Sequence, residues 1–211
     1  MNKTVNNKKF EFSKSNLELA KKEISKYPDG RSSSSIISLL WLAQKQNKGW
    51  LSEDSIEYIS SFLGMEKIRV YEIVTFYSMF NLSPVGKYHF QICGTTPCML
   101  AGAESLKEIL EKDIGKTGSV SNDNLFSWVE VECLGACCNA PVIQINDDYF
   151  EDLNVTDLKN IIQDLKKNKS IKSGSYSGRM SSEPKNTKNK FLSNAEIEKI
   201  VNNRTKPGLE S

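Results

Sequence analysis

The sequence predicts an α+β protein in which a small helical bundle is followed by an α/β domain and an irregular C-terminal tail. Apolar residues recur at helical spacing over residues 16–80, and they alternate with polar residues in short runs over residues 87–168. Beyond residue 168 the chain is rich in Ser, Lys, Gly and Asn, which is typical of irregular structure. We therefore expect a flexible N-terminus, a helical domain, a linker, an α/β domain and a basic tail at residues 1–15, 16–80, 81–86, 87–168 and 169–211.

Length and charge limit the classes of function. The chain has 211 residues, 38% of them hydrophobic, and a formal net charge of +2, which is too balanced to favour nucleic-acid binding. Residues 172–211 hold eight basic and four acidic residues, so the positive excess lies in a tail that we expect to be solvated or wrapped on a partner. No apolar run reaches the ~18–20 residues of a membrane span, and the N-terminus has no signal-peptide pattern. We expect no direct membrane insertion and a cytosolic or organelle-matrix location.

Each of the first three helices has its own start or stop signal. The first follows the cap candidate Ser15 and ends before the Pro-Asp-Gly turn at residues 28–30. The second occupies residues 32–47 behind a run of serines. Ser52 is expected to cap the third helix, and Gly64 to close it.

The fourth helix is expected from Glu66 to about Phe80, and it is apolar on nearly every side. Such a helix is usually buried, so Tyr71, Phe76 and Met79 are expected to belong to the core. The alternative is that these side chains form a surface that docks a partner subunit.

The α/β domain is expected to follow the order β-α-β-β-β-α, which has the size of a thioredoxin-like domain. Two alternating runs end directly at cysteines, the first at Cys93 and the second at Cys133. The expected elements are a strand at 87–92, a helix at 98–111, a loop at 113–124, strands at 126–132, 141–145 and 149–151, and a helix capped by Thr156. The apolar stripe of the helix at 98–111 is expected to consist of Leu100, Ala103, Leu106 and Leu110. Residues 168–190 are expected to be irregular and residues 193–203 to form a short helix.

Four cysteines form two short-spaced pairs, Cys93 with Cys98 and Cys133 with Cys137. Thr96 as a cap and a proline in the first turn predict a helix that begins just before Cys98. Unpaired N–H groups and the helix dipole there stabilise a thiolate. Four thiols in two loops indicate a metal centre, because packing alone needs no such arrangement.

The kind of metal is narrowed by what the sequence lacks. An odd count of five cysteines argues against a disulfide framework, and a single histidine, His89, excludes a Rieske centre. No Cys-x-x-Cys-His motif for haem is present, and neither pair has the Cys-x-x-Cys spacing of a redox dithiol. The spacing favours a [2Fe–2S] cluster on the four cysteines, while zinc stays open because it also accepts four thiolates.

Several segments resemble one family. Residues 90–98 with Cys-Gly-Thr-Thr-Pro-Cys, residues 132–141 with Glu-Cys-Leu-Gly-Ala-Cys-Cys-Asn-Ala-Pro, and residues 70–80 look like the thioredoxin-like [2Fe–2S] ferredoxin component of NADH:quinone oxidoreductase. That family includes the corresponding component of bacterial respiratory complex I and the 24 kDa flavoprotein subunit of the mitochondrial enzyme. Residues 177–184 are similar to the tail of its mitochondrial and alphaproteobacterial branch, so the resemblance covers roughly residues 10–185.

The resemblance implies an electron-transfer subunit rather than a complete enzyme, with no catalytic residues of its own. It carries the cluster ligands onto Cys93, Cys98, Cys133 and Cys137. FMN and NAD are expected on a larger partner flavoprotein subunit, in the peripheral arm of a membrane complex on the cytoplasmic or matrix side. No Gly-x-Gly-x-x-Gly fingerprint or P-loop indicates a nucleotide site in this chain.

Three further expectations concern the loops. No cationic residue lies between the members of either pair, which predicts a low reduction potential. Cys138 departs from the family pattern and is expected to be a small buried thiol, exchange with Cys137 being the alternative. The Ala140–Pro141 peptide is a candidate cis bond.

Two other functions remain open. One is the small diaphorase-type subunit of an NAD-linked hydrogenase or formate dehydrogenase, whose ligand loops would look alike. The other is a zinc-stabilised interaction module without redox activity. Colour separates the second, since a [2Fe–2S] protein is red-brown and a zinc protein is colourless.

Overall fold

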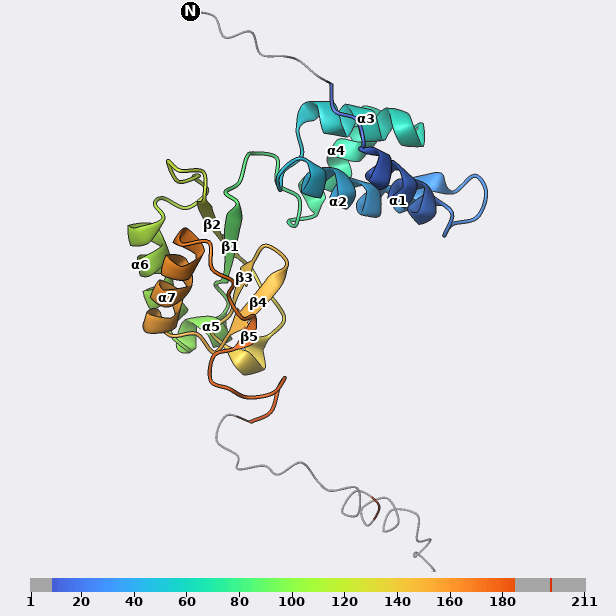
Figure 1. Cartoon of the computed structure of the whole chain (residues 1–211). Helices are drawn as coiled ribbons and strands as arrows, with labels where there is room; N and C mark the ends of the chain where they lie inside the picture. Colours follow the sequence, from blue (N-terminus) through green and yellow to red (C-terminus); the bar gives the residue numbers. More distant parts are fainter. Residues whose placement is uncertain (1–8, 185–197, 199–211) are drawn as a thin grey trace, which may run out of the picture.

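The computed structural model describes residues 9–184 and Glu198, and Figure 1 shows two groups of elements joined by a short connection. Helices α1 to α4 form the first group, and a sheet with further helices forms the second. This arrangement confirms the expected α+β fold class. The short helix expected at residues 193–203 and most of the basic tail lie outside the described residues.

Local capping chemistry sets the ends of the first helices. Helix α1 spans Lys14–Ile24 and is capped by Ser13, two residues before the expected cap. The serine run forms a 3₁₀ turn at Ser32–Ser35, and α2 follows at Ile36–Gln46. Helix α3 spans Glu53–Leu63 as expected: the Ser52 side chain accepts the Ser55 N–H, and Gly64 ends the helix with φ 62°.

The first domain encloses its own core. Its buried side chains come from all four helices, with Leu39, Leu40 and Ile59 among the fully buried ones. The segment before α1 also contributes, although it was expected to be flexible. Phe12 is buried, and its ring meets Tyr58 edge-on at 5.3 Å between centroids.

Helix α4 is shorter and less buried than expected. It spans Lys67–Phe76, and the chain becomes extended at Tyr77 with φ −89° and ψ 111°. Phe76 is 78% exposed and Met79 is 38% exposed, so the expectation that these side chains lie in the core is wrong. Phe80 alone among the last aromatic residues of this segment reaches the core, because the chain has already turned away from the helix axis.

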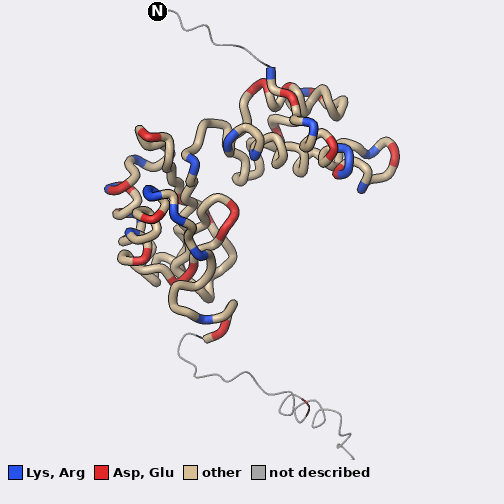
Figure 2. The backbone as a smooth tube through the Cα atoms, viewed as in Figure 1, with Lys and Arg blue, Asp and Glu red and all other residues tan. Residues whose placement is uncertain are grey.

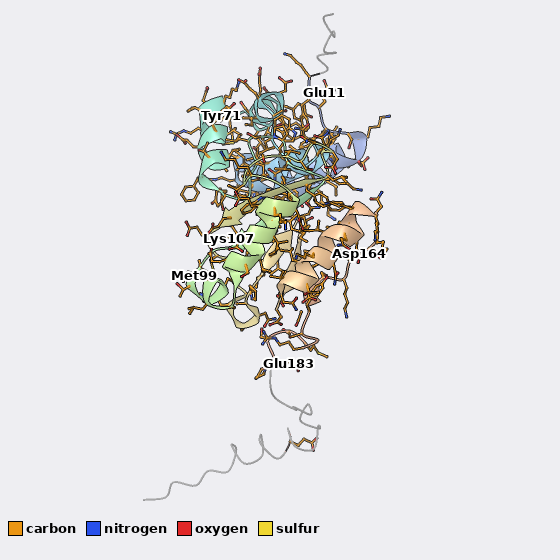
Figure 3. All side chains as sticks on the ribbon, turned by 90° about the vertical axis from the view of Figure 1, so that its left-hand side faces the viewer. Glu11, Tyr71, Met99, Lys107, Asp164 and Glu183 are labelled. Atoms are coloured by element: carbon orange, nitrogen blue, oxygen red, sulfur yellow. The ribbon has the colours of Figure 1, made fainter. Side chains whose placement is uncertain are left out.

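The second domain is built on a five-stranded sheet in the order β2-β1-β3-β4-β5. Strand β1 pairs in parallel with β2 and antiparallel with β3, β3 pairs antiparallel with β4, and β4 pairs in parallel with β5. Helices α6 and α7 lie side by side on one face of the sheet (Figures 1 and 3). The strands span Tyr88–Cys93, Phe126–Val131, Ile143–Ile145, Asp148–Glu151 and Gly174–Ser175.

Burial follows the sides of the sheet. Phe90, Ile92 and Ile143 point into the core beneath α6 and α7 and are fully buried. Gln91 and Gln144 occupy paired positions between them and are only partly buried. One face of the sheet is therefore covered by helices and the other is more open.

The helix expected at residues 98–111 is two helices. Helix α5 spans Thr96–Leu100 and α6 spans Ala103–Asp113, separated at Gly102, which has φ 102°. Because of this break, Leu100 leaves the expected apolar stripe and is 79% exposed. The cap of α5 is Thr95 rather than Thr96, and its side chain makes no capping bond.

Helix α7 spans Val155–Lys166 and begins with a capping box rather than with the expected Thr156. The Asn154 side chain accepts the N–H groups of Thr156 and Asp157, and the Asp157 carboxylate accepts the Asn154 N–H at 3.4 Å. Beyond this helix the chain returns to the sheet as β5, in a segment expected to be irregular.

Charges of both signs are interspersed along the described backbone (Figure 2). One exposed ion pair, Lys45 with Asp147 at 2.8 Å, links α2 to the β3–β4 turn. Over the residues that the structure describes, no helix has both the length and the hydropathy to cross a bilayer.

Candidate metal centre

Parallel strands bring the two cysteine loops to the same edge of the sheet. Cys93 is the last residue of β1 and is in register with Val131, the last residue of β2. Cys133 follows Val131 by two residues. Because both strands end at this edge, their parallel register brings the two cysteine loops together.

The first pair is buried at the start of α5. Cys93 is 2% exposed and Cys98, in the first turn of the helix, is 1% exposed. Both thiols belong to the same apolar core as Phe90 and Ile92. They are free rather than joined in a disulfide.

The second pair lies in an exposed loop whose backbone is nevertheless anchored. Gly135 adopts φ 74°, and its N–H donates to the Cys133 Sγ at 3.3 Å. The Tyr149 hydroxyl donates to the Leu134 carbonyl at 2.8 Å. Cys137 begins a short 3₁₀ turn that ends at Asn139.

Hydrogen bonds also cross between the loops at Cys93. Burial raises the pKa of the Cys93 thiol, but hydrogen bonds from the Thr95 hydroxyl and from the Thr95 and Leu134 backbones outweigh it, so the pKa lies below its ordinary value. The Thr95 Oγ1 lies 3.2 Å from the Cys93 Sγ. The Cys93 Sγ also lies 3.7 Å from the carbonyl oxygen of Glu132, which directly precedes Cys133, so the two loops meet at this sulfur.

The pKa values of Cys98 and Cys137 are raised by burial and by neighbouring thiols. Burial, followed by the hydrogen bond with Cys93, raises the pKa of Cys98 to about 11. Desolvation and the proximity of Cys133 and then Cys93 raise the pKa of Cys137. Thiolates that lie close enough to raise one another's pKa repel one another unless cations lie among them. The donor set therefore fits a cationic centre held by thiolates.

The grouping of these thiols is in pairs. Cys93 and Cys98 flank the first loop, and Cys133 and Cys137 flank the second. Within the described part of the chain, no three His, Cys, Asp or Glu side chains lie close enough together to hold a metal ion as they stand. A [2Fe–2S] cluster takes two protein ligands on each of its two irons, so two pairs of cysteines supply the number of ligands that it needs.

An acidic side chain beside the first loop was not anticipated. A Cβ atom on Gly94 would collide with the Glu130 Oε1, so glycine is what lets the loop pass this carboxylate. The Lys107 Nζ lies 2.8 Å from Glu130 and 2.8 Å from Glu104. Glu130 sits on the β2 neighbour of β1, a proximity that only the strand register could have predicted.

Cys138 is exposed, so the expectation of a buried thiol is wrong. Its carbonyl accepts a hydrogen bond from the Arg179 Nη2 at 2.6 Å. The Ala140–Pro141 peptide that follows this loop is cis. Arg179 contacts Cys138, and Tyr149 contacts Leu134, across separate segments of the chain. No local sequence pattern predicts either contact.

Residues 20–166 match the family model described as thioredoxin-like [2Fe–2S] ferredoxin. A component of the NADH-quinone oxidoreductase of Rickettsia typhi is 52% identical over 77% of this chain and 96% of its own length. The component of the same name from Rickettsia prowazekii is 50% identical over 77% of this chain and 93% of its own length. These relatives confirm the family resemblance.

Solved structures of an NAD⁺-reducing [NiFe]-hydrogenase share the fold. The air-oxidised form aligns with a TM-score of 0.53 at 20% identity, over 61% of this chain and 23% of the hydrogenase chain. The H₂-reduced form aligns with a TM-score of 0.54 at 19% identity, over 61% and 22%. This chain therefore spans about a quarter of the hydrogenase chain that it resembles.

Proposed function

Because this chain belongs to the thioredoxin-like [2Fe–2S] ferredoxin family, we propose that it is the [2Fe–2S] electron-transfer component of an NADH-quinone oxidoreductase, respiratory complex I. The observation that carries the proposal is the meeting of two cysteine loops at one edge of the sheet, in a chain about half identical to such components. Cys93, Cys98, Cys133 and Cys137 would hold one [2Fe–2S] cluster. When bound, that cluster accepts and releases single electrons.

Some residues of the site keep water away from the cysteine sulfurs, and others donate hydrogen bonds to them. Cys93 and Cys98 lie in the core, where water is excluded from two of the four sulfurs. The Thr95 hydroxyl lies within hydrogen-bonding distance of the Cys93 sulfur, and a hydrogen bond to a cluster sulfur raises the reduction potential. Cys133 and Cys137 are exposed, so electrons would enter and leave on that side.

We propose a low reduction potential, with electron exchange toward the FMN of a larger partner flavoprotein. The Glu130 carboxylate beside Gly94 disfavours added negative charge, and the Lys107 ammonium is shared between Glu130 and Glu104. No Lys or Arg stands between the paired cysteines. The chain would sit in the peripheral arm, on the cytoplasmic side of a bacterial inner membrane or the matrix side of a mitochondrial one, while NAD and FMN bind the partner.

Two other hosts or roles are less well supported. The relatives at about 50% identity carry the name of the quinone-linked enzyme, whereas the hydrogenase likeness at 20% identity supports only the fold. A zinc-stabilised interaction module would use the same four thiolates, but the family model that matches this chain describes a [2Fe–2S] ferredoxin.

The proposal is tested by EPR of the anaerobically purified full chain, before and after dithionite, with iron, sulfide and zinc analysis. We expect a rhombic S = 1/2 signal on reduction only, two irons and two sulfides per chain, and a negative midpoint on redox titration. Cys93→Ser and Cys133→Ser should lose most of the cluster, while Cys138→Ser is the matched control and should keep it. Stoichiometric zinc without an EPR signal, or a clearly positive midpoint, would contradict the assignment.

A further inference from the structure

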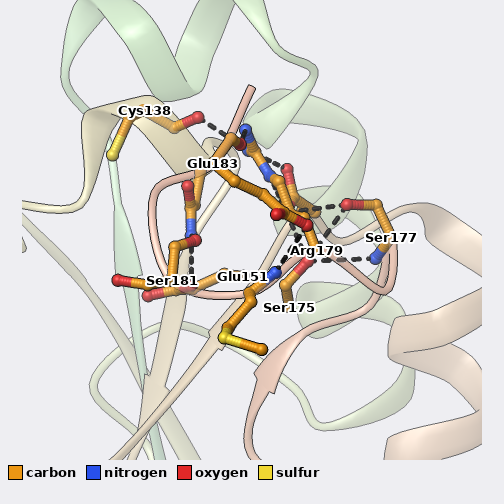
Figure 4. Close-up of polar contacts among 10 residues, drawn as sticks. Cys138, Glu151, Ser175, Ser177, Arg179, Ser181 and Glu183 are labelled. Carbon is orange, nitrogen blue, oxygen red and sulfur yellow. Dashed lines mark hydrogen bonds and ion pairs between the residues drawn. The ribbon is translucent and has the colours of Figure 1, made fainter. Parts of the chain in front are cut away.

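The C-terminal tail segment Gly174–Glu183 folds back onto the second cysteine loop (Figure 4). Its first residues form β5, which pairs with β4 so that Gly174 faces Phe150. The Tyr176 N–H donates to the Glu151 carbonyl at 2.9 Å and continues this attachment. The residues after β5 are thereby placed beside the loop that contains Cys137 and Cys138.

Arg179 is the centre of the contact. Its guanidinium pairs with both carboxylate oxygens of Asp152, with the Nε 2.7 Å from Oδ2. The two side chains are only 9% and 1% exposed. The Ser175 and Ser177 hydroxyls also donate to Oδ2 of Asp152, at 2.6 and 3.0 Å. A bidentate pair supported in this way fixes the orientation of the whole guanidinium plane.

The guanidinium group also reaches two backbone carbonyls. The Nη2 donates to the Cys138 carbonyl at 2.6 Å, and the Nη1 donates to the Glu183 carbonyl at 3.0 Å. The Asn139 Nδ2 donates to the Ser181 carbonyl at 2.9 Å. Two consecutive loop residues, Cys138 and Asn139, are therefore held by the tail.

This attachment matters because Cys137 and Cys138 are adjacent, and both are exposed. A small rotation of the loop backbone would exchange which thiol faces the other cysteines. In the structure Cys137 begins the 3₁₀ turn, and Arg179 fixes the carbonyl group of the next residue, Cys138.

We infer that Arg179 is a positioning residue that selects Cys137 rather than Cys138 as the fourth cluster ligand, an inference that rests on the proposed function. The guanidinium holds the carbonyl of Cys138 and so opposes the shift of the loop backbone that would bring the Cys138 thiol to the cluster. The tail from β5 to Glu183 thus acts as a strap across the ligand loop.

The test measures which cysteines a thiol alkylating reagent, iodoacetamide, reaches in the cluster-loaded full chain, with the labelled site located by mass spectrometry. In the unaltered protein, label should fall on Cys138 and spare the four ligands. Arg179→Gln removes the positive charge. Arg179→Lys keeps a positive charge for Asp152 but loses the planar guanidinium that donates several hydrogen bonds at once. Arg69→Gln and Arg69→Lys are the matched controls, since Arg69 pairs with Glu72 in an exposed position on α4.

We expect the labelling rate of Cys137 to rise about tenfold in Arg179→Lys, because losing a charge-assisted hydrogen bond releases the loop. Label on Cys138 should fall correspondingly as it takes over the ligand position, and the EPR signal should split into two components. The Arg69 variants should match the unaltered protein. If Arg179→Lys still labels Cys138 alone, or labels all four ligands equally, Arg179 does not select the ligand.

Hydrogen exchange of the same samples separates a local effect from general unfolding. Faster exchange confined to residues 133–140 supports the strap, whereas an equal increase in β1 shows a merely structural role for Arg179 and overturns the inference. Failure of the proposed function looks different, because the unaltered protein would then contain no iron, whichever cysteines the reagent reached.

Discussion

His89 is the histidine of β1, and it lies on the open side of the sheet, away from the cysteine loops. It is 8% exposed, and its Nδ1 lies 2.8 Å from the Ser127 Oγ. The same hydroxyl oxygen accepts the Gly86 N–H at 2.9 Å, so His89 is tied to the start of the sheet domain. Lys45 and Asp147 line an open cleft between α2 and the open face of the sheet, and His89 lies in the wall of the same cleft. These contacts give the histidine a structural role at the start of the sheet domain.

His89 should make the stability of the protein depend on pH. Burial lowers the pKa of His89 from 6.5 to about 4, so between these values the unfolded chain binds a proton that the folded chain refuses. Stability is then full above pH 6.5 and falls as the pH drops toward 4. At pH 5.5 this group should cost about 1 kcal/mol of unfolding free energy relative to pH 7.5.

Urea unfolding at pH 7.5 and pH 5.5 measures this effect, with His89→Gln as the comparison. The substituted protein should lose about 1 kcal/mol less than the unaltered protein over that interval. An identical loss in both proteins would show that His89 is protonated while folded, contrary to the burial argument.

At the scale of elements, the break at Gly102 separates two helices with different roles. Leu106 of α6 is 1% exposed in the core, whereas Leu100 of α5 is 79% exposed, although both lie on the stripe expected from the sequence. Met99 of α5 also projects outward at the edge of the molecule (Figure 3). Only α6 therefore contributes a full apolar face to the core.

Paired alanine substitutions test this division. Leu106→Ala should lower the free energy of unfolding by about 2–5 kcal/mol, because it leaves a cavity in the core. Leu100→Ala should change it by less than about 0.5 kcal/mol. Urea titration followed by circular dichroism measures both, and equal losses would mean that Leu100 is packed as well as Leu106, contrary to the division between α5 and α6.

Element type was predictable where the controlling chemistry is local. Ser52 and Gly64 mark the ends of α3 as expected, because a cap and a left-handed glycine act within one turn. Phe76 was misassigned because an all-round apolar helix does not reveal where the chain leaves it. Likewise, nothing local in the sequence announces that Arg179 reaches Cys138, a contact that depends on β5 pairing with β4.

At the scale of the whole molecule, two cores are joined by few contacts. The buried residues form two separate clusters, one within the helices α1 to α4 and one beneath α6 and α7. Gln44 holds Met79 and Asn81 at one end of the linker, and the Ser127 hydroxyl holds Gly86 at the other. An open cleft of about 780 Å³ lies between the parts, lined by α2, the linker and the open face of the sheet.

These contacts predict that the two parts lose structure independently. The Lys45–Asp147 pair has side chains that are 52% and 57% exposed, so it should couple the parts by only about 0.2–1 kcal/mol. Leu39→Ala should cost about 2–5 kcal/mol in the helical core, and Ile143→Ala a similar amount in the sheet core. Native-state hydrogen exchange should show each loss confined to its own part, with β1 amides unaffected by Leu39→Ala and α3 amides unaffected by Ile143→Ala. If either substitution accelerates exchange equally in both parts, the linker and the cleft transmit stability and the chain unfolds as a single unit.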